Sequence, residues 1–351
     1  MSSKIDVAVL GATGSVGQRY IELLDGHPQF RLRELFGSDR SAGKRYADAA
    51  DWRISASPPE EAANTVIKHH EQPVESPIVF CSLPGGLARE VETRLAAEGH
   101  YVFSNARDNR LDPDIPLLIP EVNPEHAAAV RVQQQARGWS GFVVTNPNCS
   151  TIHFVLALKP IFDAFGVEQL MVTTMQASSG AGYPGVPSLD LIDNVVPYIG
   201  GEEEKMEIES RKLLGGFDGQ EFQYADMRVS AQCNRVPVRH GHMEAINVQL
   251  RQPASPSEVV DVLRAFKGRP QELGLYSAPA NPVIVRDQPD RPQPALDRDV
   301  AGGMASIVGR VRECPLFGIK FIVLGHNTIR GAAGASILNA ELLLADGYIN
   351  A

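Results

Sequence analysis

Residues 145–160, TNPNCSTIHFVLALKP, place Cys149 between two asparagines and two hydroxyl residues, directly before an apolar helix pattern. A helix N-terminus lowers the pKa of a thiol, so this position favours a thiolate near neutral pH. The free N–H groups of the same turn can stabilise the oxyanion that forms when a thiolate attacks a carbonyl. The other cysteines lie in or beside strand patterns and are expected to be small buried side chains: Cys81, Cys233 and Cys314. Cys149 is therefore the candidate nucleophile.

A nucleophilic cysteine needs an acid/base partner, and residues 234–244 offer one. This segment, NRVPVRHGHME, holds Arg235 and His242 seven positions apart at the start of a strand pattern. An Arg–His pair is a weak signal by itself. His153 follows Cys149 by one helical turn, where packing and chemistry both fit. Five further histidines fall in expected loops, helices or surface turns and are expected to be solvated: His27, His69, His70, His100 and His126.

A glycine-rich turn, Gly11-Ala-Thr-Gly14-Ser-Val-Gly17, follows the first strand pattern and opens the first helix pattern. Its glycines let the backbone approach a pyrophosphate, and the helix N-terminus supplies free N–H groups. The spacing is GxxGxxG rather than GxGxxG, but its place between strand and helix predicts nucleotide binding.

The second strand pattern ends in FGSDRSAGK. A site for NAD usually places an acid here for the ribose hydroxyl, and Asp39 could serve. However, Ser38, Arg40, Ser41 and Lys44 surround it with donors and positive charge, which suit a 2′-phosphate better. A solvated surface loop is the alternative interpretation. We favour NADP.

The elements that must position these residues form two groups. Short strand patterns alternate with helix patterns in the first half, which predicts a parallel, doubly wound sheet. The expected strands cover residues 5–10, 32–36, 78–81, 101–103 and 142–144, and the helices 16–25, 87–98 and 124–137.

After about residue 150 the strand patterns become longer: 169–176, 244–250, 305–311 and 318–324. A capping box at 255–258 opens a helix, the proline-rich residues 279–294 are expected to form an ordered loop, and residues 331–346 form a last helix. This predicts an α+β domain with an antiparallel or mixed sheet. Its open faces need covering, which a subunit partner would provide.

Composition narrows the class of protein. The 351 residues are 43% hydrophobic and 21% charged, as in soluble globular proteins, and the net charge of −9 argues against nucleic-acid binding. No apolar run is long enough for a membrane span, and the early first strand leaves no room for a targeting peptide. Four scattered cysteines without a CxxC pair predict no disulfide, no metal site and a reducing cytoplasm.

Six motifs in order, GATGSVG, SNARDNR, NPNCST, MQASSGAGYPGVPSLD, GGEEEK and SAQCNRVPVRHGH, resemble those of aspartate-β-semialdehyde dehydrogenase of the archaeal and fungal branch. The resemblance covers essentially the whole chain. It implies NADPH-dependent reduction of aspartyl-4-phosphate to aspartate semialdehyde, on the route to lysine, threonine, methionine and isoleucine. It also implies a Rossmann-type NADP-binding domain, residues 1–149 with 329–351, and an α+β catalytic and dimerisation domain with a mixed sheet, residues 150–328.

The resemblance assigns roles by position. Cys149 corresponds to the nucleophile, His242 to the acid/base catalyst and Gln176 to the glutamine that orients the substrate. Arg235 corresponds to the bidentate clamp on the substrate carboxylate. The remaining substrate residues implied are Glu202 for the amine, with Glu209 as an alternative acid, Lys205 and Arg110 for phosphate, and Asn148.

The cofactor residues implied divide between the two halves of NADP. Ser179, Gly180 and Asn327 fall where the family contacts the nicotinamide half. The other half implies Gly11, Thr13, Gly14, Ser15, Val16, Ser38, Arg40, Ser41 and Ser82. A small-molecule substrate and a homodimer or homotetramer are expected, with no nucleic acid or membrane partner.

Three alternatives remain at this point. N-acetyl-glutamyl-phosphate reductase and malonyl-CoA reductase share the scaffold, but Arg235 together with Arg110 and Lys205 favours an amino-acid acyl phosphate. A non-catalytic NADP-binding regulator would have no need for Cys149 and His242 together.

Overall fold

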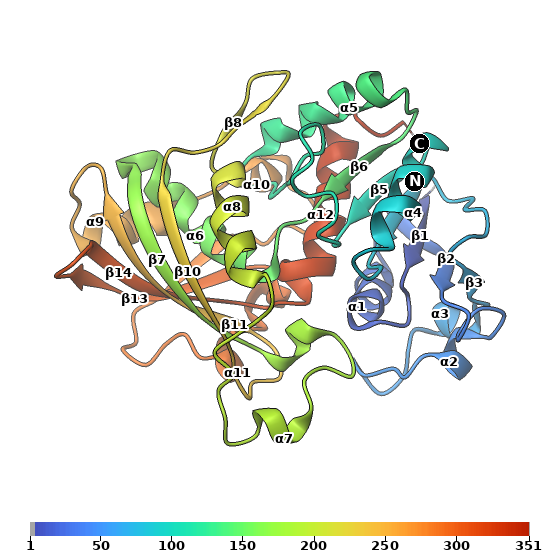
Figure 1. The fold of residues 1–351 in the computed structure, drawn as a ribbon, viewed down its shortest axis with the longest axis horizontal. Coiled ribbons are helices and arrows are strands. Elements are labelled where there is room, and N and C mark those ends of the chain that lie inside the picture. The colour runs from blue at the N-terminus through green and yellow to red at the C-terminus, as the bar shows by residue number, and fades with distance from the viewer. Residues whose placement is uncertain (1–3, 351) are drawn as a thin grey trace.

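The computed structural model describes residues 4–350, which build two six-stranded sheets lying side by side (Figure 1). The N-terminal sheet has the strand order β3-β2-β1-β4-β5-β6, and all its pairs are parallel. This is the strand order of dinucleotide-binding folds. The strands are β1 (Ile5–Leu10), β2 (Phe30–Gly37), β3 (Lys68–His69), β4 (Ile78–Cys81), β5 (Tyr101–Ser104) and β6 (Phe142–Thr145).

Helices cover both faces of the N-terminal sheet, as the near-continuous apolar sequence of its strands requires. The last helix, α12 (Gly334–Ala345), returns from the C-terminal end of the chain and packs in one core with Val7, Val9 and Phe80. On the opposite face α4 packs against Ala8 and Val79. The helices of this part are α1 (Ser15–Leu24), α2 (Tyr46–Ala49), α3 (Glu60–Asn64), α4 (Ala88–Ala97), η1 (Pro124–Ala128) and α5 (Ala129–Arg137).

The second sheet is mixed, with the order β10-β7-β11-β14-β13-β12. Two outer pairs, β10 with β7 and β13 with β12, are parallel, and the three inner pairs are antiparallel. The strands are β7 (Val167–Gln176), β10 (Arg228–Arg235), β11 (His242–Leu250), β12 (Val283–Arg286), β13 (Ser306–Cys314) and β14 (Gly318–Gly325). The predicted combination of a doubly wound parallel sheet and a mixed sheet is confirmed.

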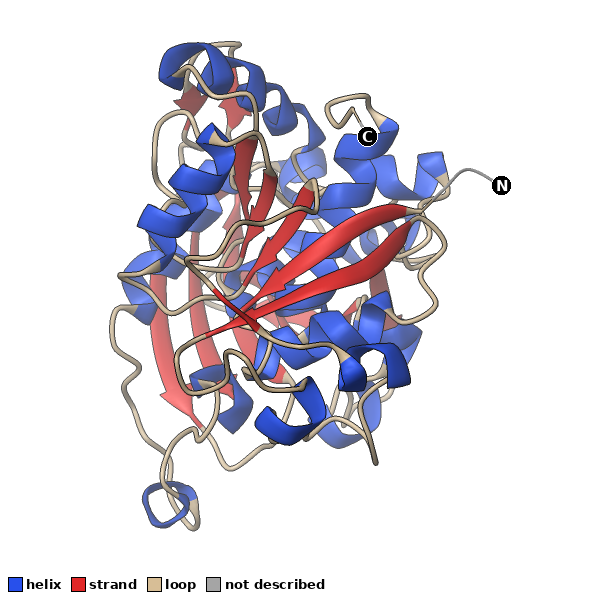
Figure 2. Cartoon of the chain, turned by 90° about the vertical axis from the view of Figure 1, so that its right-hand side faces the viewer, coloured by secondary structure: helices blue, strands red, loops and turns tan. Residues whose placement is uncertain are grey.

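Helix α6 (Cys149–Phe165) joins the two parts and is apolar nearly all round, because it lies between the second sheet and Leu117 and Ile119 of the N-terminal part. Figure 2 shows two long strands that cross the front of the view, with helices beside and behind them. The helices of the second part are η2 (Ser178–Ala181), α7 (Ser188–Leu191), α8 (Glu202–Leu213), α9 (Pro256–Ala265), α10 (Arg269–Leu273), α11 (Pro294–Asp297) and η3 (Val300–Gly303), and η4 (Ile329–Ala333) leads into α12. A short hairpin, β8 (Gly216–Phe217) and β9 (Phe222–Gln223), follows α8.

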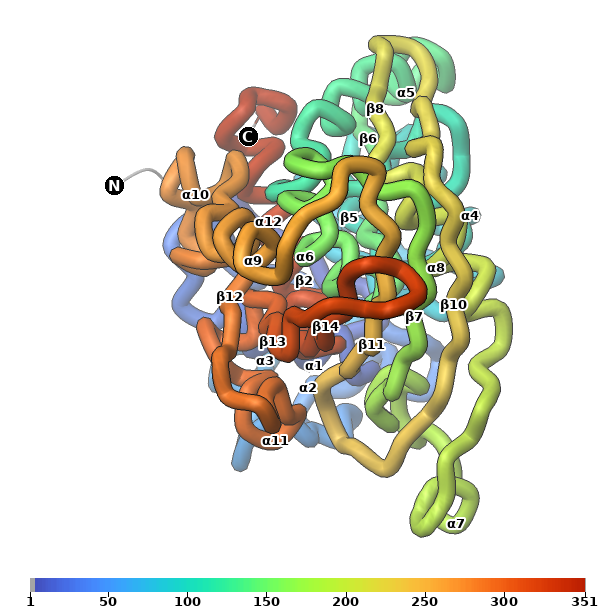
Figure 3. The backbone as a smooth tube through the Cα atoms, turned by 90° about the vertical axis from the view of Figure 1, so that its left-hand side faces the viewer, coloured from blue at the N-terminus to red at the C-terminus, as the bar shows by residue number. Residues whose placement is uncertain are grey.

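The segment around α7 projects from the body of the molecule (Figures 1 and 3). It exposes large apolar side chains: Leu189 is 89% exposed, Tyr198 71% and Ile192 65%. Within residues 4–350, no helix combines the length and the apolar character needed to cross a membrane.

One expectation about the elements was wrong, because the proline-rich residues 279–294 contain the edge strand β12 rather than only a loop. The strand β10 was not among the expected strands, although Cys233 was placed in or beside a strand pattern. The last helix pattern, 331–346, begins with the π-helical turn η4 before α12. The capping box at Ser255 and Glu258 is present at the start of α9, as expected.

Candidate active site

Three neighbouring strands bring the candidate catalytic residues together. Arg235 pairs with Gln176 across β10 and β7, and Met243 pairs with Met175 across β11 and β7. Because side chains alternate along a strand, Gln176, Arg235 and His242 all point to the buried face, toward the N-terminus of α6. Helix α6 begins at Cys149, so the ends of these three strands and the N-terminus of the helix meet at the Cys149 sulfur.

Cys149 and His242 are in contact, with 3.1 Å between Sγ and Nε2. The backbone N–H of Ala177 donates to Nδ1 of His242 at 3.0 Å. A neutral imidazole whose Nδ1 accepts carries its proton on Nε2, which here faces the sulfur. His242 is therefore oriented as a hydrogen-bond donor toward Sγ.

Burial controls the protonation of this pair in the free site. It raises the pKa of the Cys149 thiol to about 12, with the Glu202 charge adding to the rise, while Arg235 and Arg110 oppose it. Burial also lowers the pKa of His242 well below its usual range, and Arg235, His326 and His240 add to this. Burial therefore opposes the thiolate near neutral pH that was expected from the helix N-terminus.

Asn148 caps helix α6 and ties it to helix α8. Its Oδ1 accepts from the N–H groups of Ser150 and Thr151 at 2.9 and 3.1 Å, as a helix cap does. Its Nδ2 donates to Glu202 at 2.6 Å, and its backbone N–H donates to Glu209 at 2.6 Å. Two carboxylates of α8 thus hold the residue directly before Cys149.

The glutamates of α8, which the sequence could not separate, divide by contact. Glu202 pairs with Lys205 at 3.0 Å, and Glu209 pairs with Arg110 at 2.9 Å, so these two face the site. Three others do not: Glu203 and Glu207 accept backbone N–H groups of β10, and Glu204 is exposed.

Gly180 lies directly against Arg235, the predicted carboxylate clamp, and His242, the predicted acid/base catalyst. A Cβ at this position would lie 2.7 Å from Nη1 of Arg235 and 3.0 Å from Nε2 of His242. The guanidinium of Arg235 donates to the carbonyl of Ala177 at 2.8 Å, which keeps it beside the glycine. No larger residue fits here without moving the catalytic side chains.

A cleft of about 940 Å³ runs from the glycine-rich turn to Cys149. Its lining includes all the predicted cofactor residues except one: Gly11, Thr13, Gly14, Ser15, Val16, Ser38, Arg40, Ser82, Ser179, Gly180 and Asn327. A Cβ on Gly17 would lie 2.2 Å from the Gly11 carbonyl oxygen, so the turn has the tight backbone that a pyrophosphate needs. Arg40 is exposed at the rim, free to reach a 2′-phosphate. The residues present therefore fit NADP.

Ser41 differs from the other predicted cofactor residues. It is buried, and its hydroxyl donates to the carbonyl of Ser38 at 3.2 Å, so it supports the loop from behind. Asp39, the possible ribose acid, is exposed and pairs with His69 at 3.2 Å.

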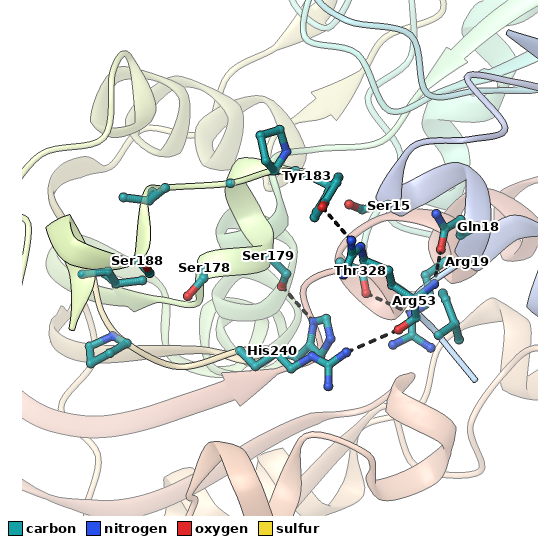
Figure 4. Close-up of a pocket in the computed structure, with 18 of the residues that line it drawn as sticks. Ser15, Gln18, Arg19, Arg53, Ser178, Ser179, Tyr183, Ser188, His240 and Thr328 are labelled. Atoms are coloured by element: carbon teal, nitrogen blue, oxygen red, sulfur yellow. Dashed lines mark hydrogen bonds between the residues drawn. The ribbon is translucent and has the colours of Figure 1, made fainter. Parts of the chain in front are cut away.

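A second cavity, of about 440 Å³, adjoins the nicotinamide end of the cleft (Figure 4). His240 contacts the hydroxyl of Ser179 at 2.9 Å, and Arg19 donates to the hydroxyl of Thr328 at 3.2 Å. Asn327 also donates to Ser179 at 2.8 Å. The walls of this cavity thus hold side chains that line the cofactor cleft.

Two buried groups near the site carried no clear signal in the sequence. His153 contacts Ser306 at 3.0 Å and packs against Gly325, so it is a core residue. Glu244 is fully buried two positions after His242, on the same strand face, and neither of its oxygens has a hydrogen-bond partner within residues 4–350. Burial raises its pKa well above the usual range. The described part of the chain holds no cluster of three or more side chains suited to a metal ion.

Comparison with known proteins gives matches along the chain. The family model "Semialdehyde dehydrogenase, NAD binding domain" matches residues 6–130, and "Semialdehyde dehydrogenase, dimerisation domain" matches residues 158–330. The aspartate-semialdehyde dehydrogenase of Methanothermobacter thermautotrophicus is 51% identical, covering 97% of this chain and 99% of that protein. That of Schizosaccharomyces pombe is 46% identical, covering 98% and 99%. The crystal structure of aspartate semialdehyde dehydrogenase with NADP from Candida albicans aligns with a TM-score of 0.92 at 44% identity, covering 98% of this chain and 100% of that one.

Proposed function

Because the chain belongs to the aspartate-semialdehyde dehydrogenase family, we propose that its cleft reduces L-aspartyl-4-phosphate to L-aspartate-4-semialdehyde through a thioester on Cys149. The reaction is an NADPH-dependent reductive dephosphorylation that serves lysine, threonine, methionine and isoleucine biosynthesis. The observation that carries the proposal is the 3.1 Å contact between Cys149 and His242 at the end of a cleft that also holds the glycine-rich turn.

The first step is attack of the Cys149 thiolate, whose proton has left to solvent, on the acyl carbon. The new S–C bond forms as the C–O bond to phosphate breaks, and inorganic phosphate leaves. Arg110 and Lys205 line the same cleft and would hold the leaving phosphate, since each can donate to its oxygens. The Arg235 and Arg110 charges favour the thiolate, and Nε2 of His242 donates to it. Three groups therefore offset the cost of burying that charge.

Different residues of the site would recognise the three polar groups of the amino-acid substrate: its carboxylate, its carbonyl and its ammonium group. Arg235 would clamp the α-carboxylate with two parallel N–H groups, and Gln176, its neighbour across the strands, would orient the carbonyl. Glu202 faces the cleft as a carboxylate, because contacts with Lys205 and Asn148 lower its pKa against the effect of burial. A carboxylate in this position suits the α-ammonium group.

The cofactor supplies the hydride that reduces the thioester. Gly11, Gly14 and Ser15 would approach its pyrophosphate, Arg40 and Ser38 its 2′-phosphate, and Ser179 and Asn327 its nicotinamide half. As charge develops on the substrate oxygen, the Nε2–H of His242 donates a hydrogen bond to it as the acid partner. Collapse of the adduct then breaks the C–S bond, releases the aldehyde and returns Cys149 as a thiolate.

A substrate comparison tests this function against the reductase alternative. The purified protein is assayed with aspartate semialdehyde, phosphate and NADP, and in parallel with malonate semialdehyde, CoA and NADP. Phosphate-dependent NADPH formation only in the first mixture supports the proposal. Faster NADPH formation in the second mixture would make malonyl-CoA the substrate of the reductive direction. NADPH formation in neither mixture would leave the protein only a nucleotide-binding role.

The proposal extends to assembly, domains and location. A match to a dimerisation domain and the exposed apolar segment around α7 support a homodimer or homotetramer. The packing of α12 against β1 and β4 supports a discontinuous NADP-binding domain, residues 1–149 with 329–351, around a catalytic domain of 150–328. Four free cysteines support a cytoplasmic location.

A further inference from the structure

Helix α8 buries a charged face. Glu202, Lys205, Glu209 and Lys212 are spaced by three, four and three residues, which places them on one side of a helix. Glu202 is 6% exposed, Glu209 2% and Lys212 1%, whereas the apolar Ile208 on another side is 38% exposed. The charged side of this helix therefore faces the interior of the protein. Three of the four residues already have roles in the proposed function, and Lys212 has none.

The ammonium group of Lys212 is fully occupied by backbone carbonyls. Nζ donates to the carbonyl oxygens of Arg110 at 2.9 Å, Asp112 at 3.1 Å and Ile115 at 2.9 Å. An ammonium has three N–H donors, so each of them has an acceptor. Lysine is almost never fully buried without partners, and here all three partners belong to one loop.

That loop carries Arg110, a predicted phosphate cation. The Arg110 side chain donates to Glu209 at 2.9 Å, and to the carbonyl of Asn105 at 2.9 Å. Its backbone carbonyl accepts from Lys212. Helix α8 therefore holds Arg110 at both ends, by Glu209 at the guanidinium and by Lys212 at the backbone. Lys205, the second phosphate cation, lies on the same helix.

We propose that Lys212 is a positioning residue for the phosphate site, which fixes the loop of Arg110 on α8 so that Arg110 and Lys205 hold phosphate together. This proposal rests on the proposed function, since it assumes that phosphate binds between these two cations. Lys212 itself is enclosed by carbonyls and does not touch the substrate. Its loss would let the loop shift, which separates the two cations without altering Cys149, Arg235 or the glycine-rich turn.

The test measures each substrate separately in the oxidative direction, with aspartate semialdehyde, phosphate and NADP. Lys212→Met keeps the length of the side chain and removes its three donors, and Lys212→Arg keeps the charge but cannot direct a planar fork to three converging carbonyls. Lys159→Met is the matched control, because Lys159 forms only a helix-surface pair with Asp163. The assay is run at pH 7, where Lys212 keeps its proton, since burial lowers its pKa only to about 8.

The wild-type protein is assayed first, and phosphate-dependent activity there establishes the proposed function independently. Lys212→Met is then expected to raise the KM for phosphate by about 10- to 100-fold, the range for losing a charge-assisted hydrogen bond, while the KM values for the aldehyde and NADP stay within about threefold. The phosphate KM of Lys212→Arg is expected to lie between those of the wild type and Lys212→Met. The phosphate KM of Lys159→Met is expected to match the wild type.

Equal changes in all three KM values, or a loss of thermal stability with an unchanged phosphate KM, would mean that Lys212 only holds the fold together. Should Lys212→Met fail to fold, the arginine variant decides alone. A selective rise of its phosphate KM supports the positioning role, and an unchanged phosphate KM overturns it.

Discussion

Replacing Gly180 with alanine should displace both Arg235 and His242. The added Cβ would lie 2.7 Å from Nη1 of Arg235 and 2.9 Å from Cε1 of His242. Ordinary contacts of this kind begin at 3.4 Å, so the guanidinium must move by about 0.7 Å and the ring by about 0.5 Å. The backbone at Gly180 needs no left-handed conformation, so the alanine itself is not strained.

These shifts act on the geometry of the reaction rather than on the fold. The ring movement disturbs the 3.1 Å contact with Cys149, and the guanidinium movement disturbs the carboxylate clamp. Misplacement by about 1 Å can cost about 100-fold in rate, so we expect kcat to fall by roughly 10- to 100-fold. The aldehyde KM should rise as well, because the clamp binds the substrate directly.

The assay is steady-state NADPH formation from aspartate semialdehyde, phosphate and NADP, with the melting temperature measured in parallel. Gly216→Ala is the matched control, since a Cβ there would meet nothing within 4 Å and its φ lies outside the left-handed region. A Gly180→Ala protein with wild-type kcat and aldehyde KM would refute the reasoning, as would one in which only the KM for NADP changes.

Three further predictions concern single groups. Arg40→Ala should weaken NADPH binding by on the order of 1.5–3 kcal/mol in a fluorescence titration and leave NADH binding nearly unchanged; equal losses would mean that this loop does not read the 2′-phosphate. His242→Asn should lower kcat by ~10²–10⁴ with little change in KM and remove the acidic limb of the pH–rate profile, because the pKa of His242 lies below its usual range; a retained limb would assign it to another group. Glu244→Gln should stabilise the protein increasingly as pH rises above about 4.3, by up to about 1.4 kcal/mol per pH unit, because the folded carboxyl has a raised pKa and stays protonated while the unfolded one ionises. Denaturant unfolding at several pH values measures this, and a constant difference from the wild type would contradict a raised pKa.

The parts of the site that the sequence predicted are those that depend on neighbours along the chain. The glycine-rich turn and the cysteine before α6 are each complete within a few residues, so their chemistry can be read locally. The second sheet was predicted as antiparallel or mixed from the lengths of its strands, but its strand β10 was not predicted. That strand alternates exposed polar residues with the half-buried apolar residues Val229 and Ala231, a short strand pattern. The carboxylates of Glu203 and Glu207 accept N–H groups along its edge, which no pattern within β10 reveals.

Tertiary burial explains what the sequence could not show. The run of charges in α8 is typical of a solvated helix face, yet Glu209 and Lys212 are almost fully buried, because their partners lie on the distant loop of Arg110. The thiol of Cys149 was expected to have a lowered pKa from its helix end. The sheet packed against that end adds a burial that raises the thiol pKa, and the residues around Cys149 in the sequence do not show it.

The central claim, a thioester on Cys149, is tested most directly by a single turnover without phosphate. Mixing the enzyme with aspartate semialdehyde and NADP should release about one NADPH per active site, because the acyl-enzyme forms but has no phosphate to accept the acyl group. Mass spectrometry should then find the aspartyl adduct on the peptide that contains Cys149, and addition of phosphate should remove it. A burst of equal size with the adduct on another residue, or turnover without any adduct, would contradict the account.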